Sequence, residues 1–117
     1  MEYTFRIKTL KNKSIQKKRL LMDFEEGYEI LSSFLEEEGM QFYEELKKLI
    51  DDVLEGEESS VSFRGNRYQA YIDPHMTVIS DTMADDEIGD WCSADTEEVL
   101  QLLEDYHEAV QKLKENE

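Results

Sequence analysis

The sequence predicts an α+β fold, in which an antiparallel sheet (an N-terminal hairpin plus a three-stranded meander) packs against two or three helices. Two kinds of hydrophobic periodicity support this prediction. Apolar and polar residues alternate near the N-terminus and between positions 59 and 81, whereas apolar residues recur every three or four positions from 42 to 54 and after 95. A chain of 117 residues with 39% apolar content is expected to form one α+β domain, residues 1–117.

The predicted meander lies between positions 59 and 81. Gly65-Asn66 separates two alternating segments and is a signal for a two-residue hairpin loop. That loop would place Phe63 opposite Tyr68 on the buried face and Arg64 opposite Arg67 on the exposed face. Two neighbouring guanidinium groups are mildly unfavourable, so they need an acidic neighbour or an acidic partner.

The second turn of the meander is expected at residues 73–75. Its proline fixes φ, and the side chain of Asp73 can accept hydrogen bonds from the backbone that follows. We expect a three-residue loop, because that length places Met76 and Val78 on the same apolar face as Ile72.

The N-terminal segment is expected to form a hairpin. Tyr3, Phe5 and Ile7 alternate with polar residues, which predicts a half-buried strand. After a loop at 11–14, residues 15–24 indicate a second strand, although their spacing would also suit a helix. For residues 25–38 the sequence is compatible with a helix or with a partly extended strand.

Two further helices are better defined. Phe42, Leu46, Leu49 and Val53 form an apolar stripe that is expected to lie across the sheet, and Gly56 stands where a helix ends. Gly39 indicates a break before this helix.

The last helix begins after Asp95, which can cap it, with Glu98 three residues on in the manner of a capping box. Its apolar stripe consists of Val99, Leu103, Tyr106, Val110 and Leu113. The stripe predicts packing on the sheet, with a dimeric coiled-coil seam as the alternative.

Charge is distributed unevenly. The formal net charge is −16, which excludes nucleic-acid binding through a generally basic surface. Residues 1–22 nevertheless carry seven basic residues and one acid, a charge of +6, so the remaining 95 residues carry −22. The basic hairpin is expected to pack near acidic helices and lower their mutual repulsion; a phosphate-binding hairpin is the alternative.

No basic residue occurs between Arg67 and Lys112, an interval with twelve acids. Part of it, residues 81–93, is predicted to be a long acidic loop, and loops of that kind are often functional. The interval is either a solvated surface or a docking face for a cationic protein, with the loop from Asp81 to Asp90 at its centre and either Trp91 or Ile88 as an apolar anchor. The candidate partner-binding residues are Asp73, Asp81, Asp85, Asp86, Glu87, Asp90, Trp91 and Glu97.

The sequence contains no motif that identifies a reaction. His75 and His107 are far apart, and no zinc-binding, calcium-binding, phosphate-loop or nucleophile motif occurs, so no catalytic residue, metal or cofactor is predicted. Cys92 alone cannot form an internal disulfide and is expected to be buried, which fits a reducing compartment. No apolar run approaches the length of a membrane span and no signal peptide is recognisable, so a cytoplasmic protein is expected.

Scattered positions resemble the uncharacterised bacterial YacL-like family. They are Met1-Glu2-Tyr3-x-Phe5, Gly27-Tyr28-Glu29-Ile30-Leu31 with Phe34 before Glu36-Glu37-Glu38, Gly65-x-x-Tyr68, and Cys92 leading into Glu98–Leu103 with Tyr106. In size, charge and element order the chain is also similar to small acidic immunity proteins of bacterial toxin systems, including contact-dependent growth inhibition.

These likenesses imply a non-enzymatic binding protein. The leading hypothesis is an immunity protein, monomeric or weakly dimeric, that docks an acidic face into the basic cleft of a cognate toxin nuclease and binds no nucleic acid itself. The alternative is a cytosolic regulatory or scaffolding protein of the YacL-like type.

Overall fold

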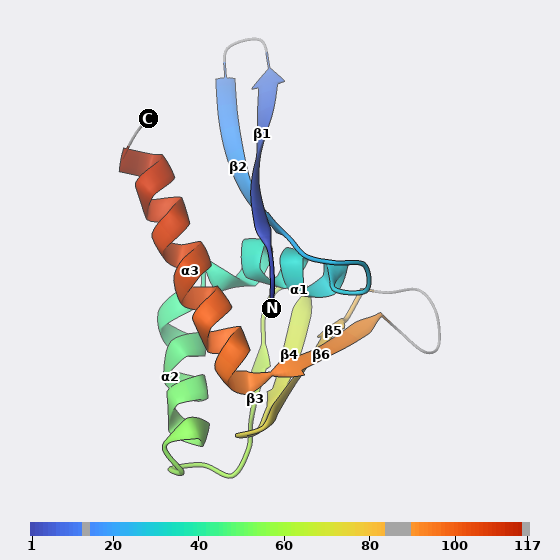
Figure 1. Cartoon of the computed structure of the whole chain (residues 1–117), viewed down its shortest axis with the longest axis vertical. Helices are drawn as coiled ribbons and strands as arrows, with labels where there is room; N and C mark the ends of the chain where they lie inside the picture. The colour runs from blue at the N-terminus through green and yellow to red at the C-terminus, as the bar shows by residue number, and fades with distance from the viewer. Residues whose placement is uncertain (13–14, 84–89, 116–117) are drawn as a thin grey trace.

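A computed structural model describes residues 1–12, 15–83 and 90–115 of the chain. It has the predicted α+β architecture: a two-stranded hairpin, a four-stranded antiparallel sheet and helices that pack against it (Figure 1). The elements in order are β1 (Thr4–Asn12), β2 (Ile15–Asp23), α1 (Glu29–Phe34), the π-helix η1 (Leu35–Gly39), α2 (Tyr43–Leu54), β3 (Val61–Arg64), β4 (Tyr68–Ile72), β5 (Met76–Asp81), β6 (Trp91–Asp95) and α3 (Thr96–Glu115).

The N-terminal hairpin forms as predicted, but its first strand is largely exposed instead of half-buried. β1 and β2 pair only with each other and project from the body beside α3 (Figure 1). The side chains of Phe5 and Ile7 are 43% and 53% exposed, whereas Leu20 and Met22 near the base of β2 are buried. The prediction was wrong because the alternation of side chains specifies a strand, while burial depends on whether another element covers it.

Residues 29–39 are helical, which settles the choice between helix and strand. Leu31, Phe34 and Leu35 are buried in the core. The predicted break at Gly39 is the end of η1, where a Cβ atom would lie 3.2 Å from the Cδ1 atom of Leu103. A glycine there lets η1 pack closely on α3.

The end of α2 is also as predicted. Gly56 has a φ of +83° directly after the C-cap residue Glu55, a backbone conformation that glycine adopts without strain. Leu46, Ile50 and Val53 of α2 are buried in the core, and the helix packs on β3 and β4 as expected.

The meander has four strands in the order β3-β4-β5-β6, one more than predicted, and the N-terminal hairpin forms a separate two-stranded sheet instead of joining it. Residues 91–95 form β6 rather than the end of a long acidic loop. Cys92 and Ala94 point to the core and alternate with exposed or half-buried neighbours. This short alternation is easily overlooked, because both inward side chains are small and the surroundings are acidic.

The register of the β3–β4 hairpin differs from the predicted register by two residues. Gly65 N donates to Tyr68 O at 2.9 Å, so Asn66 and Arg67 form the loop rather than Gly65 and Asn66. Phe63 therefore lies opposite Ala70, and Arg64 lies opposite Gln69 instead of Arg67. A shift of two residues keeps the predicted buried face, since side chains alternate with a period of two.

The predicted three-residue loop between β4 and β5 is wrong. Asp73 N donates to Met76 O at 3.0 Å, which closes a two-residue loop and turns Thr77 and Ile79 inward instead of Met76 and Val78. Thr77 is tolerated in the core because its hydroxyl is 2.8 Å from the hydroxyl of Thr96, with which it shares a hydrogen bond.

α3 begins as predicted. The Oδ1 atom of Asp95 accepts hydrogen bonds from the backbone N–H groups of Glu97 and Glu98 at 3.0 and 3.3 Å. The carboxylate of Glu98 pairs with the ammonium group of Met1 at 3.2 Å, rather than completing a capping box. No helix in the described residues has the length and apolar character needed to cross a membrane.

The first half of the apolar stripe of α3 packs into the core. Val99, Leu102, Leu103 and Tyr106 are buried, and the hydroxyl of Tyr106 donates to Leu20 O at 2.7 Å. This bond ties the base of the hairpin to the body, and burial raises the pKa of Tyr106 to about 12.

Candidate partner-binding surface

The outer face of the four-stranded sheet combines aromatic and polar side chains. Helices pack against the inner face, where Phe63, Ala70 and Ile79 are buried. Because side chains alternate along each strand, the neighbouring residues point outward. The outward residues are Ser62, Arg64, Gln69, Tyr71, Met76, Val78, Ser80, Trp91 and Ser93.

The strand register arranges most of these side chains in two rows across the sheet. The first row is Ser62, Tyr71, Val78 and Ser93, and the second is Arg64, Gln69, Ser80 and Trp91. The side chains of Tyr71 and Trp91 are 49% and 58% exposed. A hollow of about 430 Å³ lies between Arg64 and Tyr71 on this face.

Three predicted residues lie at the end of the sheet where β5 ends and β6 begins. Asp81 is already engaged, since its carboxylate accepts hydrogen bonds from Arg67 Nε and Nη2 at 3.2 and 3.0 Å and from Met83 N at 2.9 Å. Asp90 is exposed, its carbonyl accepts from Asp81 N at 2.9 Å, and Trp91 follows it. Only Asp90 and Trp91 are therefore free to meet a partner here.

Two predicted residues lie at the opposite end of the sheet. Asp73 belongs to the β4–β5 turn, where its Oδ1 atom accepts from His75 N at 2.8 Å and Met76 N at 2.7 Å. Glu97 is exposed in the first turn of α3, and Thr96 before it donates to Asp73 O at 2.7 Å. The length of β5 separates this pair from Asp90.

The predicted acidic residues thus form two groups, one at each end of the sheet. The remaining three, Asp85, Asp86 and Glu87, lie outside the described residues. The outer face with its aromatic side chains lies between the two groups.

Local hydrogen bonds stabilise two of these carboxylates in their charged form. The guanidinium of Arg67 lowers the pKa of Asp81 below its usual value, and the backbone N–H groups of Met76 and His75 lower that of Asp73. Asp81 is neutralised by a cation of the same chain. Asp73 keeps its charge but directs one oxygen to the turn.

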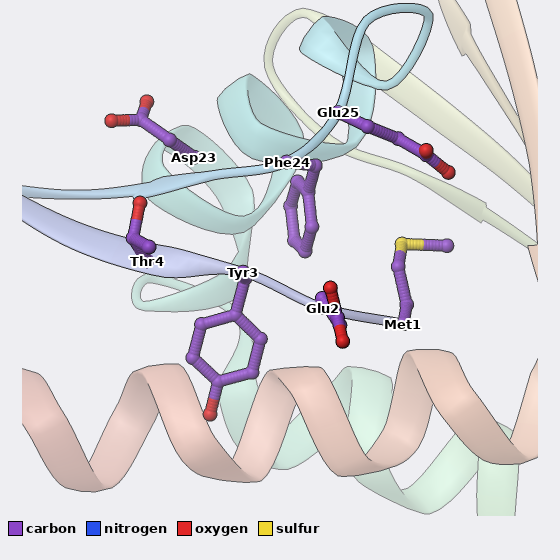
Figure 2. Close-up of a pocket in the computed structure, with 7 residues that line it drawn as sticks. All are labelled: Met1, Glu2, Tyr3, Thr4, Asp23, Phe24 and Glu25. Atoms are coloured by element: carbon purple, nitrogen blue, oxygen red, sulfur yellow. The ribbon is translucent and has the colours of Figure 1, made fainter.

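A hollow of about 880 Å³ lies between the N-terminal segment and the connection from β2 to α1. Figure 2 shows the side chains of Asp23 and Glu25 pointing in opposite directions, while Tyr3 extends toward α3. Asp23 binds Arg6 at 2.8 and 3.2 Å, and the hydroxyl of Tyr3 donates to Asp105 at 2.8 Å. A catalytic site requires ionisable groups that converge on one point, and these groups do not.

Cys92 lies on the inner face next to Trp91. Burial raises the pKa of its thiol to about 11, so the thiol is neutral and unreactive near pH 7. Within residues 1–12, 15–83 and 90–115, no group of three or more His, Cys, Asp or Glu side chains is placed to hold a metal ion.

Sequence reasoning did not find Tyr71 and Arg64 as candidates for the site. The signal was present, because both alternate with the residues assigned to the buried face of the meander. What was missing was β6, which places Trp91 in the same row as Arg64.

Comparison with known proteins gives one informative similarity. No protein-family model matches the chain, and no solved structure matches it. The resemblance to the YacL-like family and the contact-dependent type of immunity protein stay predictions. Over 114 residues, which cover 97% of this chain and 93% of the other, the chain is 26% identical to a Bacillus cereus protein named "Immunity protein".

Proposed function

We propose that this protein is an immunity protein that neutralises a cognate toxin by binding it. The observation that carries the proposal is the similarity to the Bacillus cereus immunity protein, which extends over nearly the full length of both chains. A net charge of −16 further suits a cationic toxin, such as a nuclease with a basic active-site cleft, because opposite charges accelerate encounter.

The proposed docking surface is the outer face of the sheet with the acidic groups at its two ends. Trp91, Tyr71 and Arg64 supply the three residue types that most often dominate binding energy at protein interfaces. Asp90 at one end and Glu97 at the other give this surface a charged rim around a partly aromatic centre, the usual anatomy of an interface.

The carboxylates are not expected to contribute equally. Asp81 is paired with Arg67, so its loss should affect folding more than affinity. Asp90 and Glu97 are exposed and form no ion pair in the described part of the chain. Asp85, Asp86 and Glu87 are expected to add long-range attraction through their negative charge.

The test of function is rescue of cells. The C-terminal domain encoded by the gene immediately upstream is expressed with and without this protein, and survival is counted. We expect survival only with the protein present, together with a one-to-one complex in titration calorimetry that weakens at high salt. Growth arrest that the protein leaves unrelieved, with no complex formed, would contradict the function.

The test of the surface uses matched variants with the same toxin domain. Trp91→Ala and Tyr71→Ala are each expected to weaken binding by about 30-fold, as loss of an interface anchor does. Phe5→Ala, which removes another exposed aromatic ring from the hairpin, is the control and should leave affinity unchanged.

Charge-reversal variants test whether the acidic residues at the rim of the surface attract the toxin. Asp90→Lys is expected to slow association by about tenfold at low salt and much less at high salt, whereas Glu44→Lys on α2 should have little effect. The same reversal at Asp85, Asp86 and Glu87 should slow association further. If a variant that combines Trp91→Ala, Tyr71→Ala and Asp90→Lys still rescues the cells, the immunity function would stand, but the toxin would have to bind another surface.

A further inference from the structure

A groove separates β2 of the projecting hairpin from the C-terminal half of α3, and nothing in the proposed toxin-binding surface accounts for it. The groove has a volume of about 450 Å³. Figure 1 shows the hairpin and α3 leaving the body side by side. Its lining includes three lysines, Lys17, Lys18 and Lys114. It also includes the apolar side chains of Leu20, Val110 and Leu113.

The groove is positively charged despite the acidic composition of the chain. Its two carboxylates are neutralised, since Arg19 binds Glu36 through two hydrogen bonds, one from Nε at 2.8 Å, and Arg67 lies 3.8 Å from Glu37. In the regions that the structure describes, none of the three lysines forms an ion pair. Among the described residues, the ion pair between Arg19 and Glu36 represents the predicted packing of the basic hairpin against acidic helices.

The groove also continues the apolar core outward. Val110 and Leu113 extend the buried stripe of α3 beyond Tyr106 and are only half-buried. On the hairpin, Ile7 lies opposite Leu20, so it shares the face that points to the core, yet its side chain is 53% exposed. Exposed apolar groups beside unpaired cations favour an occupant that supplies both kinds of contact.

We propose that this groove binds an acidic segment of a partner protein that carries apolar side chains between its carboxylates. Carboxylates would pair with the lysines at the rim, and the apolar side chains would contact Val110 and Leu113. Nucleic acid fits less well, because the chain outside residues 1–22 carries −22 and repels a long polyanion. The groove is separate from the proposed toxin-binding surface, which lies on the outer face of the four-stranded sheet.

The experiment uses the full chain and three labelled probes in fluorescence anisotropy. The first probe is a glutamate-rich peptide of about 14 residues with a leucine at every fourth position, the second replaces each leucine by serine, and the third is an oligothymidylate of equal length. We expect the leucine peptide to bind at low salt, the serine peptide to bind about tenfold more weakly, and the oligothymidylate to bind more weakly than either peptide.

Two pairs of variants separate the groove from general charge. The double variant Lys17→Gln/Lys18→Gln is expected to weaken binding of the leucine peptide by about tenfold. The double variant Lys8→Gln/Lys11→Gln makes the same charge change on β1 outside the groove and should change the affinity by less than about twofold. Leu113→Gln should weaken the leucine peptide but not the serine peptide. Melting curves of each variant check that the fold is retained.

Several results would overturn the proposal. If neither peptide binds, or if both lysine pairs weaken binding equally, the groove is no specific site. If the oligothymidylate binds as tightly as the leucine peptide, the hairpin attracts polyanions in general. None of these results would bear on rescue from the toxin, which is measured without the probes.

Discussion

Two hairpins of the molecule, β1–β2 and β3–β4, differ in what surrounds them. Both are antiparallel pairs with alternating sequences. The β3–β4 hairpin is covered on one face by helices, and its turn is held by Glu38 of η1, which accepts from Asn66 N at 3.1 Å. The β1–β2 hairpin contacts the body at its base, through Leu20, Met22 and the bond from Tyr106.

The difference shows that one pattern can serve two purposes. In β3–β4 the apolar side chains of the alternation stabilise the core. In β1 similar side chains are largely exposed, which contributes little to folding and leaves them available to another molecule. Variants in the two hairpins should therefore have very different effects on stability.

The largest effect is expected at Gly65. A Cβ atom there would lie 1.2 Å from the buried Oε2 atom of Glu38, so Gly65→Ala requires the turn or η1 to move. We expect a loss of about 2–3 kcal/mol in the free energy of unfolding, measured by urea denaturation.

A double-mutant cycle identifies the cause. Glu38→Ala removes the clashing carboxylate, so Gly65→Ala should cost much less in that background than in the original chain. Equal costs in the two backgrounds would show that the clash with Glu38 is not the origin of the loss.

A smaller, pH-dependent effect is expected for the ion pair beside the same turn. Hydrogen bonding to Arg67 lowers the pKa of Asp81 in the folded state below that of the unfolded chain. The pair therefore stabilises the protein above the unfolded pKa, near 3.9, and this contribution is lost as pH falls through the folded value. Asp81→Asn should lower the melting temperature by a few degrees at pH 7 and not at pH 2.

Asp90→Asn is the control for that experiment, since Asp90 is exposed and its carboxylate has no ion pair among the described residues. Its melting temperature should follow that of the original chain at every pH. A pH dependence that Asp81→Asn leaves unchanged would assign the acid sensitivity to other carboxylates.

The smallest effect is expected in the projecting hairpin. Ile7→Thr keeps a β-branched side chain and should change the free energy of unfolding by no more than about 0.5 kcal/mol, because the position is already exposed. Ile79→Thr, the same change at a fully buried position of β5, should cost about 2–3 kcal/mol. Similar losses for the two variants would mean that the hairpin is covered in solution.

The sequence was sufficient to predict the class of fold and most elements, because strands and helices differ in period. It placed the cap at Asp95 and the end of α2 at Gly56 correctly. The register of the β4–β5 turn was not predictable from hydrophobicity, which favoured Met76 and Val78 over Thr77. The hydroxyl of Thr77 is satisfied by Thr96, nineteen residues away, and such a long-range partner leaves no local signal.

The candidate surface was predictable only in part. Counting charges singled out Asp90 and Glu97 as candidates, and Trp91 was added as a candidate apolar anchor, but the count could not show that Asp81 is neutralised by Arg67. It also grouped residues that lie at opposite ends of the sheet. Proximity in the sequence does not show at which end of a strand a residue lies.

The position of the one tryptophan has a practical consequence. Trp91 is more than half exposed on the outer face of the sheet, and the chain contains no other tryptophan. Its intrinsic fluorescence therefore reports on that face alone, without contributions from the core. A molecule that covers the indole and excludes water from it would shift the emission to shorter wavelength, so contact with this face becomes visible in unlabelled protein.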